Sequence, residues 1–118
     1  MTDDQIVFGT FLDRELVGIA GLRREPLEKV RHKALLWGVF IRPDWRRGGL
    51  ARRLLSHAVS YARTSGVLQI HLCVNAENVR ARALYDALGF ASFGREPRAL
   101  RVGDRFFDEE HMVLRLDA

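Results

Sequence analysis

The chain has 118 residues, enough for one small globular domain. Hydrophobic residues make up 47% and charged residues 29% of it, so the chain is apolar enough to fold, and wholesale disorder is not expected. No segment approaches the ~18 uncharged apolar residues of a membrane span, and no secretory signal peptide is visible, so we expect a cytoplasmic protein without membrane contact. The one cysteine excludes a disulfide framework, and no Cys/His cluster has zinc-ligand spacing.

The charge of the chain is moderately basic. Lys and Arg total 19 against 15 Asp and Glu, which gives a formal net charge of +4. Arginine dominates, and its planar guanidinium suits bidentate contact with phosphate or carboxylate groups, although an ordinary solvated surface has the same composition. The excess of positive charge is compatible with an anionic ligand but does not identify one. Because no basic motif with interleaved aromatic residues occurs, nucleic-acid binding is not expected.

The first half of the chain alternates β-rich segments with turns. Residues 5–12 and 16–22 are predicted to form a hairpin across the turn at residues 13–15, followed by a charged connection over residues 23–32. The nearly unbroken apolar run at residues 34–41 predicts a central strand buried on both faces. We therefore expect Trp37, which lies within this run, in the core.

The second half contains both predicted helices. Apolar residues recur at three- and four-residue steps from Leu50, which predicts a long helix ended by Gly66. A strand over residues 67–74 follows, in which Cys73 is expected to behave as a small buried hydrophobe. A short helix then runs from a capping Asn78 to Gly89. The predicted closing hairpin comprises residues 90–102 and 106–116.

The resulting order is β-β-β-α-β-α-β-β. It predicts an α/β fold with a mixed, mostly antiparallel sheet around a central β-α-β unit, whose crossover is expected to be right-handed.

The segment between the third strand and the long helix is a candidate ligand site. A helix N-terminus carries unpaired N–H groups and a partial positive charge, so it attracts phosphate. Gly48 and Gly49 leave room for a diphosphate close to the backbone, and Arg46 and Arg47 add positive charge. An ordinary glycine-rich turn between a strand and a helix would show the same sequence pattern. The segment has neither the Gly-Lys-Ser/Thr of a Walker loop nor G-x-G-x-x-G spacing.

Two spaced motifs carry a family resemblance. The RxxGxA motif at residues 46–51 resembles the R/Q-x-x-G-x-G/A signature of the GNAT superfamily of N-acetyltransferases. The NxxAxxLYxxxGF motif at residues 78–90 looks like the second signature of that family. Each motif alone is moderately specific, whereas both together, in order on the expected strand-helix-strand-helix frame, strongly favour a GNAT-like fold with splayed central strands.

The resemblance implies acetyl-CoA as co-substrate and no metal. By similarity, Val39 and Ile41 offer backbone hydrogen bonds to the pantetheine arm. The pyrophosphate is expected on the backbone N–H groups of Arg47, Gly48, Gly49, Leu50 and Ala51. Three further side chains are expected at the cofactor, namely Arg46 at the first motif position, Arg52 in the first helical turn and Asn78 from the opposite side.

The implied reaction is direct acyl transfer, in which a neutral amine attacks the thioester and CoA leaves as a thiolate. Tyr85 is the candidate catalytic residue, because a phenol near the sulfur can donate a proton to the thiolate. The alternative is that Tyr85 is only a core residue of its helix. A general base is less evident, since Cys73 stands where some relatives place an acid. Glu25, Glu110 and His111 remain as candidates.

The family resemblance leaves the acceptor open to a primary amine of a small molecule, peptide or protein. We expect residues 1–118 to form a single acetyltransferase domain that lacks the usual N-terminal strand and helices, either as a fragment or mis-started product or as a genuinely short version. Residues 5–12 would then form an exposed sheet edge, which a second copy of the chain could cover by forming a homodimer. A non-catalytic acyl-CoA-binding module is the alternative function.

Overall fold

The computed structural model describes residues 4–46 and 48–117. The strands are β1 (Gln5–Leu12), β2 (Glu15–Arg24), β3 (Lys33–Ile41), β4 (Gln69–Asn75), β5 (Ala91–Val102) and β6 (Arg105–Arg115). The helices are α1 (Leu50–Thr64) and α2 (Val79–Ala87), with 3-10 turns at Glu28–Val30 and Pro43–Trp45. This order confirms the prediction. No helix among the described residues is long and apolar enough to cross a membrane.

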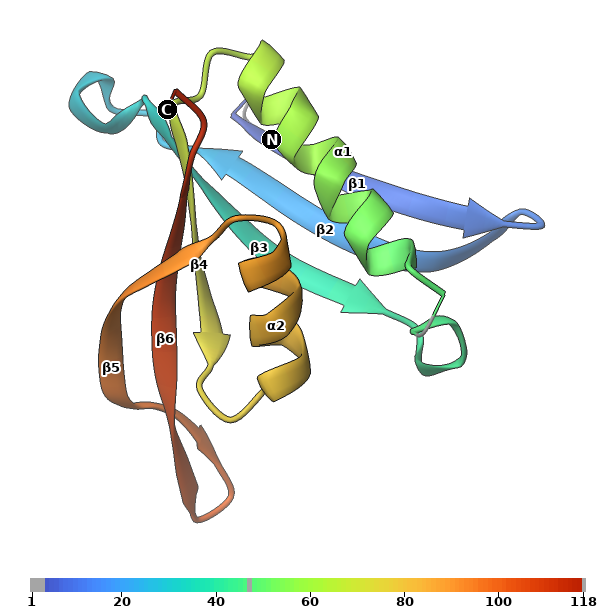
Figure 1. The fold of residues 1–118 in the computed structure, drawn as a ribbon, viewed down its shortest axis with the longest axis vertical. Coiled ribbons are helices and arrows are strands. Elements are labelled where there is room, and N and C mark those ends of the chain that lie inside the picture. The colour runs from blue at the N-terminus through green and yellow to red at the C-terminus, as the bar shows by residue number, and fades with distance from the viewer. Residues whose placement is uncertain (1–3, 47, 118) are drawn as a thin grey trace.

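One sheet holds all six strands in the order β1-β2-β3-β4-β6-β5. Among the described strands, β3 and β4 are the one parallel pair, and they pair over Lys33–Leu35 and Gln69–His71. Beyond these residues the two strands diverge, as Figure 1 shows, while β4 stays paired with β6 along its whole length. The predicted splay is therefore confirmed, and it opens the sheet at its centre.

The hydrophobic core lies between the sheet and α1. The buried positions of α1 are its apolar ones at helical spacing: Leu50, Leu54, Leu55, Ala58 and Ala62. Figure 1 shows α1 lying across β1 and β2, whereas α2 lies beside the gap between β3 and β4. Gly66, with a φ of +85°, ends α1 in the left-handed region expected of a residue just past a helix. The two helices thus begin on either side of the splay.

Several strand boundaries differ from the sequence prediction by one or two residues. The β1–β2 turn is shorter than predicted, because Asp13 and Arg14 both have positive φ and Leu12 pairs directly with Glu15. The strand β4 begins two residues late, because the Val67 N–H donates to the Ala62 carbonyl at 3.1 Å and closes the end of α1.

The prediction that the third strand is buried on both faces is wrong. Leu36 faces the core, but the next side chain, Trp37, is 38% exposed on the opposite face, where its ring covers Gly21. Phe40 is 49% exposed. The strand is apolar because α1 covers one face and aromatic side chains lie on the other. Cys73 is also exposed rather than buried, since it alternates with the buried Leu72 and Val74 on β4.

Candidate functional site

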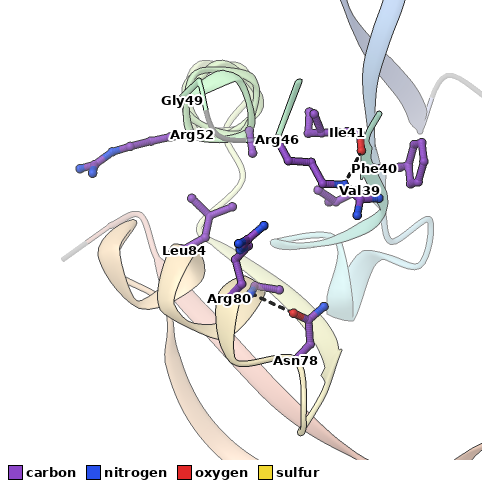
Figure 2. A pocket seen from close by; sticks show the side chains of 11 residues that line it. Val39, Phe40, Ile41, Arg46, Gly49, Arg52, Asn78, Arg80 and Leu84 are labelled. Atoms are coloured by element: carbon purple, nitrogen blue, oxygen red, sulfur yellow. Dashed lines mark hydrogen bonds between the residues drawn. The ribbon is translucent and has the colours of Figure 1, made fainter. Parts of the chain in front are cut away.

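A cavity of about 430 Å³ lies where β3, α1 and α2 approach one another beyond the splay. It is lined by Val39, Phe40, Ile41, Arg46, Gly49, Ala51, Arg52, Asn78, Arg80, Ala81 and Leu84. Figure 2 shows these side chains arranged around the gap, with α1 on one side and α2 on the other. Both sequence motifs therefore meet in one place, although 26 residues separate their facing ends at positions 51 and 78.

Seven of the ten residues expected at the cofactor line this cavity: Val39, Ile41, Arg46, Gly49, Ala51, Arg52 and Asn78. Of the other three, Arg47 lies outside the described residues. Leu50 is 8% exposed and packs its side chain into the core, so only its backbone could serve a ligand. Gly48 is exposed in the turn before α1 but does not line the cavity.

The cavity is bounded by the N-terminus of α1. Gly49 precedes the helix with a φ of +77°, and its carbonyl accepts the first helical hydrogen bond, from Arg53 N–H at 3.2 Å. No side chain caps the helix start at Gly49. The first-turn N–H groups are thus left for a ligand, and the helix dipole adds partial positive charge. A Cβ at Gly49 would meet no protein atom within 4 Å, so packing does not account for the glycine, whereas its backbone conformation does.

The charged side chains of the lining are all positive. Arg46, Arg52 and Arg80 approach the cavity from different segments, and no carboxylate of residues 4–46 or 48–117 lines it. In Figure 2 Arg80 rises from α2 towards the gap between the helices, whereas Arg52 extends away from its centre. This field favours an anionic ligand with several charges, such as a diphosphate.

Arg46 is held in place by the end of β3. Its Nε donates to the Ile41 carbonyl at 2.8 Å, and its guanidinium lies 5.4 Å from the centroid of the Phe40 ring. The bond occupies the Ile41 carbonyl, so among the two expected β3 residues Val39 is better placed to bond an extended ligand. Gly38, with a φ of +62°, lies in the β-bulge of β3 that changes the direction of the strand at Val39.

Asn78 caps α2 as predicted. Its side-chain oxygen accepts from Ala81 N–H at 3.1 Å, the bond drawn in Figure 2, so its amide NH₂ remains as a donor at the cavity wall.

A second cavity, of about 330 Å³, adjoins the first. The two share Val39, Asn78, Ala81 and Leu84 in their linings. The second extends into the splay and is bordered by Tyr85 from α2 and by Cys73 from β4. An elongated ligand can therefore run from the positive end at α1 to Tyr85.

Tyr85 combines the core role with access to the cavity. It is 7% exposed, its ring lies 5.8 Å from that of Phe90, and burial raises the pKa of its phenol. The hydroxyl therefore stays protonated at neutral pH, which is the state that a proton donor needs.

The three candidate bases differ sharply. Glu110 is buried and paired with Arg95 at 2.6 Å, and hydrogen bonds from Arg95 and Ser92 lower the pKa of its carboxyl. Glu25 borders neither cavity. The His111 Nδ1 lies 3.4 Å from the Sγ of Cys73, so His111 is the candidate in contact with a residue of the second cavity.

Sequence reasoning missed Arg80 and Phe40. Arg80 occupies a variable position of the NxxAxxLY motif, and the signal that could have found it is its place in the first turn of a helix facing the phosphate loop. In the sequence, Phe40 is distinguished only as one member of an apolar strand. Its role as a platform for Arg46 depends on the fold.

Comparison with known proteins relates the whole site to one family. The model of the acetyltransferase (GNAT) family matches residues 1–90. The ribosomal protein bS18 alanine N-acetyltransferase of Salmonella typhimurium is 43% identical over 61 residues, which cover 52% of this chain and 41% of that protein. An L-amino acid N-acyltransferase of Escherichia coli is 30% identical over 79 residues, which cover 67% of this chain and 46% of that protein. The chain thus spans less than half the length of these two relatives.

Solved structures of acetyltransferases share this fold. A GNAT-family acetyltransferase of Streptococcus pneumoniae matches with a TM-score of 0.90 and 29% identity, over 97% of this chain and 68% of that one. A ribosomal-protein-alanine N-acetyltransferase of Brucella melitensis matches with a TM-score of 0.85 and 26% identity, over 92% of this chain and 67% of that one. With both signature motifs facing one cavity and a family match over most of its length, the chain belongs to the GNAT family of acetyltransferases.

Proposed function

We propose that this protein transfers the acetyl group of acetyl-CoA to a primary amine by direct attack. The observation that carries the proposal is the continuity of the two cavities. A positively charged end at the start of α1 leads through the splay of β3 and β4 to Tyr85. The charge distribution along this path suits a ligand that is anionic at one end and reacts at the other.

The donor set fits the diphosphate and pantetheine of acetyl-CoA. Backbone N–H groups of residues 48–51 bind the pyrophosphate at the positive end of α1, with Arg46, Arg52 and Arg80 around it. The Val39 backbone, on the edge of β3 that β4 leaves unpaired, bonds the pantetheine amides. Asn78 donates from α2. We also assign Arg47, next to Gly48, to this set, and take residues 1–118 as one domain.

Acetyl-CoA supplies an activated thioester when bound. Tyr85 then acts as the general acid, because its phenol is protonated, is buried beside Phe90, and borders the second cavity, which none of the three arginines lines. Its proton neutralises the charge that develops on sulfur as the carbon–sulfur bond breaks.

The acceptor is a primary amine, and the relatives suggest where to begin. The Salmonella relative is named for acetylating an alanine of a ribosomal protein, and the Escherichia coli one for acylating amino acids. We propose a peptide or protein α-amine first and a free amino acid second, acetylated in the cytoplasm, with no metal, nucleic acid or membrane involved.

We also propose a homodimer formed through the β1 edge. This strand has β2 on one side only, and its Val7 is 54% exposed. Sedimentation should show a dimer at micromolar concentration, and a Val7→Lys variant should be monomeric. A wild-type monomer at all concentrations would contradict the proposal.

The test of the function is thiol release from acetyl-CoA with a panel of amines: an alanine-initiated peptide, free amino acids and spermidine. We expect CoA release and an acetylated product with at least one of them. If calorimetry shows that acetyl-CoA binds and no amine is acetylated, the chain is the non-catalytic acyl-CoA-binding module instead.

A further inference from the structure

Three titratable side chains lie in a row on the sheet face opposite the core, one from each of three neighbouring strands. The Sγ of Cys73 on β4 lies 3.4 Å from the Nδ1 of His111 on β6. The Nε2 of His111 lies 3.6 Å from a carboxylate oxygen of Glu96 on β5. The sheet register produces this row, because Cys73 and His111 are directly opposite each other.

The imidazole is held between its two neighbours. The Phe93 ring packs edge-on against His111, with centroids 6.0 Å apart, and limits its rotation. Glu96 can only accept a proton, so its position beside Nε2 favours the tautomer with the proton on Nε2. The Nδ1 lone pair then faces the Cys73 thiol, which donates to it.

The row ends at the cavity that contains Tyr85. Cys73 borders that cavity, whereas His111 and Glu96 lie behind it. A group entering the cavity between β3 and β4 therefore meets the general acid on α2 and the thiol on β4. No carboxylate among the described residues borders either cavity, so a base has to come from elsewhere.

The carboxylates near Cys73 limit the chemistry that its thiol can perform. Partial burial, together with the charges of Glu109 and Glu96, raises the pKa of Cys73. A reactive nucleophilic cysteine needs the opposite environment, one that stabilises the thiolate. A protonated thiol beside two carboxylates instead suits the approach of a positively charged amine.

We propose that Cys73 and His111 form a proton relay that deprotonates the acceptor amine, with Glu96 as a positioning residue. This inference rests on the proposed function. The amine N–H bond breaks and an S–H bond forms at Cys73, while the original thiol proton moves to Nδ1 of His111. The electron pair stays on the amine nitrogen, which attacks the acetyl carbonyl. The positive charge ends on the imidazolium beside Glu96 and is later lost with the proton to water.

The relay replaces a single carboxylate by two side chains. A thiol passes a proton on only if its partner accepts one, so neither residue works without the other. A carboxylate placed at residue 73 would accept the proton directly and would no longer need His111. This difference gives the relay a signature that a merely structural role lacks.

The first test compares kcat/KM, with the best amine of the panel, for wild type, Cys73→Ala and His111→Gln. Each variant should lose at least tenfold, with the Kd for acetyl-CoA unchanged, because general-base contributions are typically about 100- to 10,000-fold. His71→Gln is the matched control, since His71 contacts Phe93 from the same face of β4 but forms its hydrogen bond with Gln69. It should stay within about twofold of wild type. Melting temperatures of all variants exclude unfolding.

The second test is the double variant Cys73→Glu/His111→Gln, which should recover at least tenfold over His111→Gln alone. If His111 only supports the sheet, the added carboxylate recovers nothing, and the relay is overturned.

Two readouts do not depend on turnover. Nitrogen NMR of the imidazoles should show His111 with Nδ1 unprotonated, and the reverse tautomer would contradict the relay. Mass spectrometry after incubation with acetyl-CoA alone should find Cys73 unmodified. An acetyl group on Cys73 would instead establish a covalent intermediate and overturn the relay.

The outcomes separate the two proposals. A wild-type protein that acetylates no amine refutes the proposed function. A wild type that acetylates an amine, with Cys73→Ala and His111→Gln equally active, refutes the relay and leaves the function standing.

Discussion

Arg46 donates from its Nε to the carbonyl of Ile41 at 2.8 Å, which ties the first position of the RxxGxA motif to the last residue of β3. The bond orients a flexible side chain before any ligand arrives, and the guanidinium also lies over the Phe40 ring. A pre-oriented cation costs less ordering free energy on binding than a mobile one.

Replacing Arg46 by Ala should therefore weaken acetyl-CoA binding by about tenfold or more, in line with the ~1.5–3 kcal/mol of a hydrogen bond to a charged group. Arg46→Lys should not restore binding, because an ammonium cannot keep the Nε bond while it faces the ligand. Calorimetry measures the Kd. Arg63→Ala is the control, since it removes the same charge at the far end of α1, and equal losses in both variants would show only a general charge effect.

Gly49→Val should remove acetyl-CoA binding while the protein stays folded. An added Cβ meets no protein atom within 4 Å, but it stands where a diphosphate must approach the backbone. The φ of +77° adds strain, so Gly66→Val, at a φ of +85° and far from the cavity, serves as the control for strain alone. Unchanged affinity in Gly49→Val would refute the phosphate loop.

Alkylation of the single cysteine reports on the second cavity. Because the pKa of Cys73 is raised, less thiolate is present at pH 7–8 than in a free thiol, and iodoacetamide should react slowly there. The rate should rise with pH and level off only above the ordinary thiol range. Saturating acetyl-CoA should slow the reaction severalfold, since Cys73 borders the cavity. A rate unaffected by acetyl-CoA would separate Cys73 from the site.

The order of the elements and the position of the loop were predictable because each rests on local chemistry. Gly66 and Gly89 both adopt the positive φ that ends a helix, and Asn78 caps α2 through a bond to a residue three positions away. That the two motifs face one cavity was expected from the family resemblance rather than from spacing, and the lining of the cavity agrees with it.

Burial on β3 and β4 was not predictable in the same way. An apolar run such as residues 34–41 is compatible with two covered faces or one, and only the packing of α1 decides between them. Cys73 is exposed because strand alternation puts it on the face away from the helices. Its contact with His111 joins residues 38 positions apart, and no local signal in the sequence specifies that register.

The most direct test of the acetyl-transfer account is the pair of constants kcat and acetyl-CoA Kd for wild type and Tyr85→Phe. The substitution removes only the hydroxyl and keeps the ring packed against Phe90, so the fold and the affinity should be preserved. Because the hydroxyl acts when charge has moved onto sulfur, kcat should fall by at least roughly tenfold, within the ~100- to 10,000-fold range of general acids reduced by a substituting water. Equal kcat values, with circular dichroism confirming the fold, would show that Tyr85 is not the acid and would contradict the account.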